Sequence, residues 1–304
     1  MNIKSLAPLT YGMPTDKCGI TVRLGVAKGF FRDEGIDLSM RVIYGGPELA
    51  AAYSSGEIPF GEMGSPPCVA AIGRGANFSI VGGGVRRKAH MYVGVRRDIG
   101  GWEELKGKRI GLLSRGSCPE WFLRTMLIAR GFDPDRDVQF VGLHEDYSRV
   151  VDVIEEGRID AALAVEPAMS IGEEREVLRV LAAVHRDEAV PPIQWIVRVA
   201  NREFSASNHS LIEAALRACV HSAKYAAGHV DEWIDFAAKH YGISWATAKK
   251  AIKRDLPDLH FSGEVDFTGL QKVLDLQLRL GALDRPLALG GVLNGRFLPA
   301  GEKV

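Results

Sequence analysis

The sequence predicts an α/β protein with two lobes, each a mostly parallel sheet flanked by helices, and a ligand cleft between the lobes. Short apolar runs alternate with amphipathic segments in two successive blocks, residues 4–85 and 90–167, and this βαβα order is typical of parallel sheets with covering helices. Gly- and Pro-rich turns separate the runs. A chain of 304 residues, 46% of them hydrophobic, is long enough for about two domains.

The first block alternates strictly between the two element types. Apolar runs that end in Gly predict strands, and segments with apolar residues at helical spacing predict helices. The predicted strands are residues 4–12, 37–45, 59–64 and 77–85, and the predicted helices are 19–35, 46–56 and 65–75.

The second block repeats this rhythm, and a helical region follows it. Here the predicted strands are residues 108–113, 138–143 and 160–167, and the predicted helices are 119–131 and 147–157. Residues 207–280 are predicted to be mostly amphipathic helix, with the clearest helical spacing in 209–228 and 230–242.

Two strand-like segments, near residues 79–95 and 193–200, are placed to cross between the lobes. Residues 1–92 and 195–304 are therefore expected to form lobe I, and 93–194 lobe II. In open α/β sheets ligands bind beyond the carboxyl ends of strands, so the turns that follow the strands are the predicted site.

The amino-acid composition gives no sign of a nucleic-acid-binding, membrane-spanning or metal-binding protein. The net charge is zero and the pI is about 7.1, which gives no reason to expect a nucleic-acid partner. No apolar run approaches the roughly 20 residues that a membrane span needs. No metal site and no cofactor are predicted, because the cysteines are scattered without a CxxC pair; they are Cys18, Cys68, Cys118 and Cys219.

The N-terminal stretch "MNIKSLAPLTYGMPTDKCG" lacks the apolar core and cleavage site of a secretory signal. The protein is expected to be cytoplasmic as the sequence stands, or periplasmic where an export signal has been removed and a start Met added.

An ordered series of motifs over residues 24–169 resembles the SsuA/THI5-like (NMT1) family of type II periplasmic-binding-protein folds. The series comprises "VAKGFFRDEGIDLSMRVIYGGPELAAAYSSGEIPFGEMGSPPCVAAIGRG", then "ELKGKRIGL", then "EEGRIDAALAVEPAM". The family is similar in having a helix ending in Lys-Gly-Phe-Phe, a helix ending in Ser-Gly-Glu, and a Gly-Ser-Pro-Pro turn.

The resemblance implies a solute-binding protein that closes two lobes around a small organic anion and works with an ABC permease. It also leaves open a cytoplasmic enzyme on the same fold, either a decarboxylase of an aromatic or small carboxylic acid or a THI5-like pyrimidine-precursor synthase. The chain has no counterpart of the "CCCFC" run of those synthases. An intracellular ligand sensor is a third reading.

Taken with the turn chemistry, the resemblance predicts ligand contacts from lobe I. Gly pairs followed by Pro open helix N-termini whose amides attract anions, and a Ser hydroxyl adds a donor that can also cap its helix. The predicted contacts are Tyr11, Gly45, Gly46, Gly64 and Ser65. The glycines can equally be plain tight turns.

Lobe II offers a hydroxyl- and guanidinium-bearing turn between a predicted strand and helix. Such a turn suits a carboxylate, sulfonate or phosphate. Its residues are Ser114, Arg115, Gly116 and Ser117. The alternative is that Ser117 caps the helix while Arg115 is solvated.

Four further residues lie at predicted strand ends. Glu166 is expected to face the cleft and accept a hydrogen bond from the ligand, or else to pair with an Arg across the cleft or cap the next helix. Arg86, beside the "GGG" at residues 82–84, is expected to neutralise an anion or to face solvent. If the protein is an enzyme, His144, His90 and Glu166 are the candidate acid–base groups.

Overall fold

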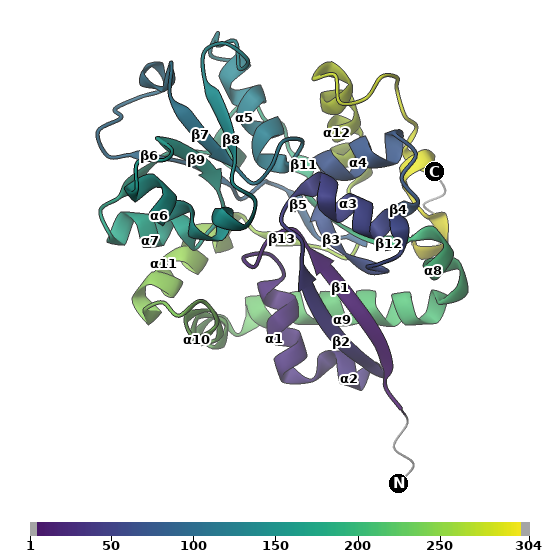
Figure 1. The fold of residues 1–304 in the computed structure, drawn as a ribbon. Coiled ribbons are helices and arrows are strands. Elements are labelled where there is room, and N and C mark those ends of the chain that lie inside the picture. Colours follow the sequence, from purple (N-terminus) through teal and green to yellow (C-terminus); the bar gives the residue numbers. More distant parts are fainter. Residues whose placement is uncertain (1–4, 299–304) are drawn as a thin grey trace.

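The computed structural model describes residues 5–298 and shows two α/β lobes side by side (Figure 1). The predicted first strand begins at residue 4, outside the described range. The first lobe contains a five-stranded sheet in the order β2 (Ile36–Val42), β1 (Ala7–Met13), β3 (Phe60–Gly64), β12 (Ile196–Asn201) and β4 (Phe78–Gly83).

The second lobe also contains a five-stranded sheet. Its order is β10 (Leu178–Ala183), β6 (Tyr92–Arg96), β9 (Ala161–Ala164), β7 (Arg109–Leu112) and β8 (Gln139–Gly142). The α/β architecture agrees with the sequence prediction, but both sheets are mixed. Strands β12 and β6 run antiparallel to their neighbours, because each belongs to a segment that has just crossed from the other lobe.

A small third sheet joins the lobes where the chain crosses. Strand β5 (Val85–Arg87) pairs antiparallel with β11 (Ile193–Gln194) and with β13 (His260–Phe261). The outgoing and returning crossings are thus held together. The predicted lobe boundaries, between residues 92 and 93 and between residues 194 and 195, fall close to this sheet. The division of the chain at these positions stays a prediction.

Helices cover both faces of each sheet (Figure 1). Around the first sheet lie α1 (Ile20–Lys28), α2 (Phe30–Asp33), α3 (Gly46–Ser55), α4 (Ser65–Gly73), α8 (Arg202–Ser207) and α9 (His209–Gly228). Around the second lie α5 (Cys118–Ile128), α6 (Val150–Glu155) and α7 (Ala168–Glu174). The C-terminal part adds α10 (Val230–Tyr241), α11 (Trp245–Asp255), α12 (Phe267–Arg279) and α13 (Leu289–Val292).

Short 3₁₀ helices complete the chain at Glu103–Leu105 (η1), His144–Arg149 (η2), Val184–Arg186 (η3), Leu256–Asp258 (η4) and Gly295–Phe297 (η5). The single helix predicted over 19–35 is instead two helices. Gly29 separates them with φ 88°, a left-handed conformation that glycine adopts without steric cost.

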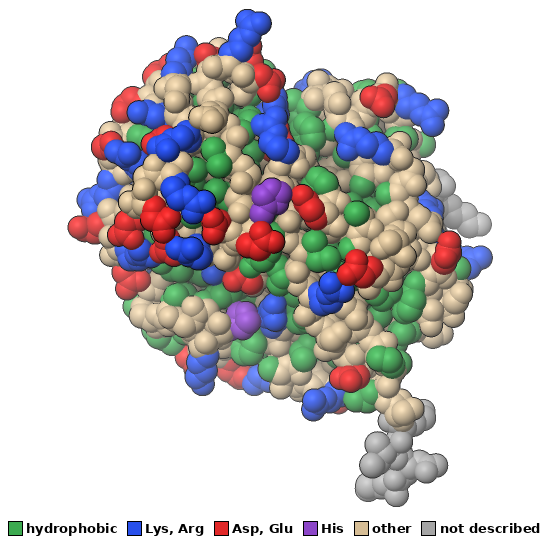
Figure 2. Space-filling model, viewed as in Figure 1, with side chains coloured by type: hydrophobic (Ala, Val, Ile, Leu, Met, Phe, Trp, Pro, Cys, Tyr) green, Lys and Arg blue, Asp and Glu red, His purple; other side chains and the backbone are tan. Residues whose placement is uncertain are grey.

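Helix α11 links the C-terminal region to the second lobe. It follows β12 in sequence, yet it packs against α7 of the second lobe. Among the described residues, no helix is long and apolar enough to cross a bilayer. Basic and acidic side chains are interspersed over the face shown in Figure 2, without a patch of a single sign.

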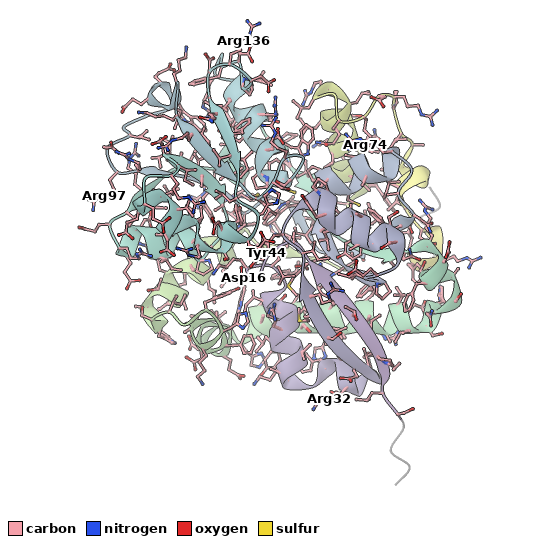
Figure 3. The ribbon with its side chains drawn as sticks, in the orientation of Figure 1. Asp16, Arg32, Tyr44, Arg74, Arg97 and Arg136 are labelled. Atoms are coloured by element: carbon pink, nitrogen blue, oxygen red, sulfur yellow. The ribbon has the colours of Figure 1, made fainter. Side chains whose placement is uncertain are left out.

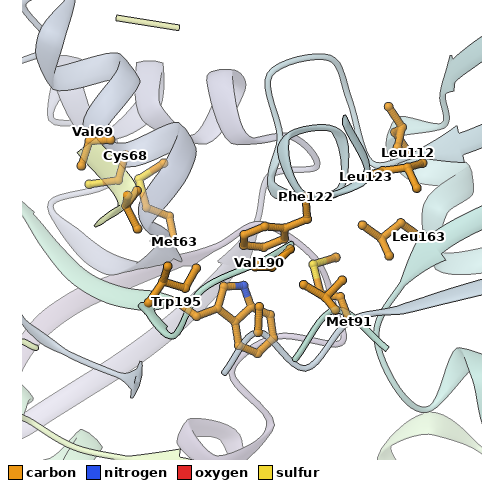
Figure 4. Close-up of a cluster of buried hydrophobic side chains, with 14 of the residues drawn as sticks. Met63, Cys68, Val69, Met91, Leu112, Phe122, Leu123, Leu163, Val190 and Trp195 are labelled. Carbon is orange, nitrogen blue, oxygen red and sulfur yellow. The ribbon is translucent and has the colours of Figure 1, made fainter. Parts of the chain in front are cut away.

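One apolar core continues from lobe to lobe. Met63 and Cys68 of the first lobe, Phe122 and Leu163 of the second, and Trp195 of the returning crossing belong to the same cluster (Figure 4). All of them are buried. Because the two lobes share this core, the structure describes a closed arrangement in which the lobes are in contact.

Candidate functional site

The candidate site is a partly open cavity of about 150 Å³ between the lobes. It is lined by the end of the β1–α1 loop and start of α1, by strands β3, β5, β12 and β13, by the turn after β9, and by helices α10 and α11. An apolar cavity of about this volume is large enough to hold a benzene ring. The cavity therefore suits a small molecule.

A second cavity of about 50 Å³ adjoins the first. Four residues line both, namely Cys18, Val165, Trp195 and Ile196. The smaller cavity lies among the predicted turns, since Gly46, Gly64 and Ser117 line it. Together the two cavities form a site with a wide compartment and a narrow apolar extension.

A buried ion pair forms one wall of the larger cavity. Arg198 Nη1 donates a hydrogen bond of 2.6 Å to Glu62 Oε2, and the Tyr11 hydroxyl donates to the same oxygen at 2.8 Å. Glu62 and Arg198 lie directly opposite each other in the β3–β12 ladder, and each is only 6% exposed. Two charges removed from water in this way require each other as partners.

Glu166 lines the larger cavity, in the turn after β9 where the sequence analysis placed it. Its carboxylate accepts hydrogen bonds from the Ser170 amide and hydroxyl, both at 3.0 Å, and from Arg254 Nη1 at 2.7 Å. Burial raises the pKa of the Glu166 carboxyl, while Arg254 opposes the shift. In this arrangement Glu166 pairs with Arg254 and bonds to the first turn of α7, while its predicted contact with a ligand stays a prediction.

His90 also lines the larger cavity, but both of its ring nitrogens face protein groups. Nε2 lies 3.0 Å from the Asp258 carbonyl oxygen, and Nδ1 lies 3.5 Å from Asp255 Oδ1. Its ring stacks on His185 at 4.7 Å between centroids. Burial lowers the pKa of His185 to about 4, so this neighbour is uncharged at neutral pH.

The loop before α1 supplies a thiol and an ammonium group to the cavity wall. Burial raises the pKa of the Cys18 thiol to about 12, so it is not a thiolate at neutral pH. Lys17 Nζ lies 3.8 Å from Asp16 and 4.7 Å from the centre of the Tyr241 ring. Figure 3 shows Asp16 near the middle of the molecule, between the lobes.

The predicted turns of lobe I form, but protein groups occupy the polar atoms of Ser65. Its amide donates to the Trp195 carbonyl oxygen at 2.8 Å and its hydroxyl donates to the Gln194 carbonyl oxygen. Gly45, the residue that precedes α3, has φ 127°, a conformation that other residues rarely adopt. Whether Gly45, Gly46, Gly64 and Ser65 contact a ligand stays a prediction.

The predicted lobe II turn is also internally bonded. The Gly116 amide donates to Glu120 Oε2 at 2.6 Å, and Ser117 Oγ donates to the Ser114 carbonyl oxygen at 2.5 Å. Arg115 pairs with Glu120 at 3.0 Å and is largely exposed. The ligand-binding role of this turn stays a prediction, and of its four residues only Ser117 lines either of the two cavities described above.

Three other predicted residues lie outside both cavities. Tyr11 is fully buried, and its hydroxyl donates a hydrogen bond that orients the Glu62 carboxylate. Arg86 lies 3.8 Å from the exposed Glu264. His144 is half exposed and lies 3.8 Å from Glu48, so the three acid–base candidates do not gather at one point.

The aromatic and carboxylate lining of the larger cavity was not among the residues predicted from the sequence. Its main members are Glu62, Trp195, Trp233, Tyr241, Asp255 and Phe261. A Glu in a strand that is otherwise apolar is a signal that a partner must exist, and Glu62 carries that signal. In residues 5–298, no group of three or more His, Cys, Asp or Glu side chains is arranged to hold a metal ion.

Comparison with known proteins supports the fold. The alkanesulfonate-binding protein SsuA from Xanthomonas axonopodis pv. citri, bound to MOPS, superposes with a TM-score of 0.80 over 95% of this chain and 98% of its own, at 18% identity. The aliphatic sulphonate-binding SsuA from Escherichia coli gives 0.74 over 99% and 95%, at 17% identity. The protein therefore has the type II periplasmic-binding-protein fold that the sequence predicted.

The Bacillus subtilis protein YtlA is 21% identical over 169 residues. This match spans 55% of the chain and only about half, 50%, of the relative's own length. The family model described as NMT1/THI5 like matches residues 20–233, which cover more than half of the sequence. The chain belongs to the NMT1/THI5-like family.

Proposed function

We propose that the protein is the solute-binding component of an ABC-type uptake system and closes its two lobes around a small molecule. The observation that carries this proposal is the cavity between the lobes, whose wall is built from both lobes and from the segments that connect them. Ligand contacts to both lobes are what shift a two-lobed protein toward its closed form. Membership of the family and the likeness to SsuA structures support the same role.

The predicted ligand, a small organic anion, has less support than the receptor role. The amides and the guanidinium that were expected to hold it are bonded within the protein at Ser65, Gly116 and Arg115. The sulfonates bound by the similar structures are ligands of those proteins.

The experiment is to incubate the purified protein with a metabolite extract and to identify what it retains by mass spectrometry. If the protein retains one small molecule that is chemically unchanged, the result supports the receptor role. The matched control is Ala251→Phe, because Ala251 lines the cavity and is 4% exposed, so that a phenyl ring there fills the space. Retention that is equal in both proteins, or absent in both, contradicts the proposal.

The enzyme alternative is tested by the same samples. His90 and Glu166 both line the cavity, which is the observation in its favour, but His90 Nε2 and the Glu166 carboxylate are already hydrogen-bonded to protein groups. A metabolite that disappears while a product lighter by carbon dioxide accumulates indicates a decarboxylase. Turnover lost in Glu166→Gln, with ligand retention unchanged, then assigns the acid–base role.

A further inference from the structure

The charges that line the larger cavity favour a cationic ligand over an anionic one. Its basic residues are Lys17 and Arg198, and its acidic residues are Glu62, Glu166 and Asp255. An anion would therefore meet more carboxylates than cations. This inference rests on the proposed receptor function and concerns the ligand that the same cavity takes.

Both basic groups in the wall are already neutralised by protein partners. Arg198 donates to Glu62 at 2.6 Å. Lys17 lies beside Asp16 and over the ring of Tyr241. A carboxylate or sulfonate that entered the cavity would have to compete with these partners, and breaking a buried ion pair leaves its other member uncompensated.

Two acceptors in the wall are free, in contrast. Glu62 is 6% exposed, yet only its Oε2 is hydrogen-bonded within residues 5–298. Its Oε1 points toward Gly19 at the start of α1, which lines the same cavity. Asp255 uses Oδ1 for the Tyr92 hydroxyl, and its Oδ2 accepts no hydrogen bond from the described part of the chain.

The remaining carboxylate, Glu166, is fully engaged by Ser170 and Arg254. Asp255 is thus the one acidic residue of the lining, within residues 5–298, whose charge no Lys or Arg matches at ion-pair distance. It belongs to α11, whereas Glu62 belongs to β3 of the first lobe. A ligand that contacts both carboxylates joins α11 to the first lobe.

Aromatic rings make up much of the rest of the wall. Trp195, Trp233, Tyr241 and Phe261 line the cavity, and ring faces attract cations through their quadrupole. The indole N–H groups of Trp195 and Trp233 are buried and have no hydrogen-bond partner among the described residues.

We propose that the ligand is a small amine with a body about the size of one aromatic ring, whose protonated amino group is held by Glu62 and Asp255. The amino group supplies the donors that Glu62 Oε1 and Asp255 Oδ2 lack, and the body lies against the aromatic wall. The volume of about 150 Å³ limits the body to about a benzene ring.

The test compares three probes that share one body and differ in charge: phenethylamine, its acid counterpart hydrocinnamate and the uncharged phenethyl alcohol. Calorimetric titration of the wild-type protein is expected to give the amine an affinity at least about tenfold above the acid, since charged hydrogen bonds are lost in the acid. Asp255→Asn is expected to reduce amine affinity by about tenfold and to reduce alcohol affinity much less, because only the amine loses a charged hydrogen bond.

Glu62→Gln is the second variant, and a melting curve must show first that it folds. Glu264→Gln is the matched control, because Glu264 is exposed, lies beside Arg86 and does not line the cavity. Tighter binding of the acid than of the amine overturns the inference, and so does the absence of binding by every probe. If either outcome occurs, retention of a metabolite from the extract shows whether the receptor function holds even though the amine inference has failed.

Discussion

Replacing Gly64 with alanine is expected to hold the two lobes apart. Gly64 ends β3 in the first lobe, and its φ of −69° and ψ of 140° are open to alanine, so the backbone carries no strain. A Cβ at this position would lie 2.0 Å from the Sγ of Cys118, at the start of α5 in the second lobe. Heavy atoms in contact are normally about 3.5–4.0 Å apart.

The size of the effect follows from this overlap. Forcing an extra methyl group into a packed interface costs about 1–3 kcal/mol. Because the overlap exists only when the lobes meet, this cost opposes closure and not the folding of either lobe. The dissociation constant of the retained ligand should therefore rise by roughly fivefold to 150-fold.

The assay is calorimetric titration of the ligand recovered from the extract, with solution X-ray scattering to follow closure. Removing the sulfur should relieve the overlap, since the Cβ of Cys118 would lie 3.6 Å from the new methyl group, an ordinary contact distance. Gly64→Ala combined with Cys118→Ala is therefore expected to recover most of the affinity of Cys118→Ala alone. Unchanged affinity in Gly64→Ala, or failure of this rescue, refutes the reasoning.

Three further changes test the site and its supports. The pKa of His185 is lowered to about 4 from 6.5, so as the pH falls the unfolded chain takes up a proton at this residue before the folded chain does, and the folded state loses stability. Between pH 6.5 and pH 4, urea unfolding should show that the free energy of unfolding falls by about 3 kcal/mol more in the wild type than in His185→Gln. Arg254→Ala leaves the buried Glu166 carboxylate without its cation, and thermal melting should show a loss of about 3 kcal/mol, which Glu166→Gln in the same chain should partly restore. Arg115→Ala removes only an exposed partner of Glu120, so ligand affinity should change less than about twofold, and a larger loss would support its predicted contact with an anion.

The fold could be predicted because its signals are local. The apolar run at 160–167 corresponds to β9 (Ala161–Ala164), all four residues of which are buried, and the spacing in 209–228 corresponds to α9 (His209–Gly228). The mixed direction of the sheets could not be predicted in the same way. It depends on which strand pairs with β12, and no local pattern specifies that choice.

The polar wall of the cavity could not be predicted for the same physical reason. Glu62 and Arg198 face each other across the β3–β12 ladder, so their pairing is known only once the register of two distant strands is known. Each residue alone, in an apolar strand, signals that a partner exists without naming it. Asp255 reaches the cavity because α11 packs on α7, which the helical spacing of the C-terminal region does not specify.

The predicted anion turns show how tertiary contacts change what a local motif offers. A Ser or Gly amide at a helix start is a free donor only while nothing else in the fold accepts from it. The returning crossing accepts from Ser65 through the Trp195 carbonyl oxygen, and Glu120 accepts from the Gly116 amide. Because these donors are occupied in the closed form, polar contacts to a ligand are expected to come from side chains whose polar atoms lack a partner among the described residues. In this cavity those include the Glu62 and Asp255 carboxylates, which is why the charge of the ligand is the property most worth measuring.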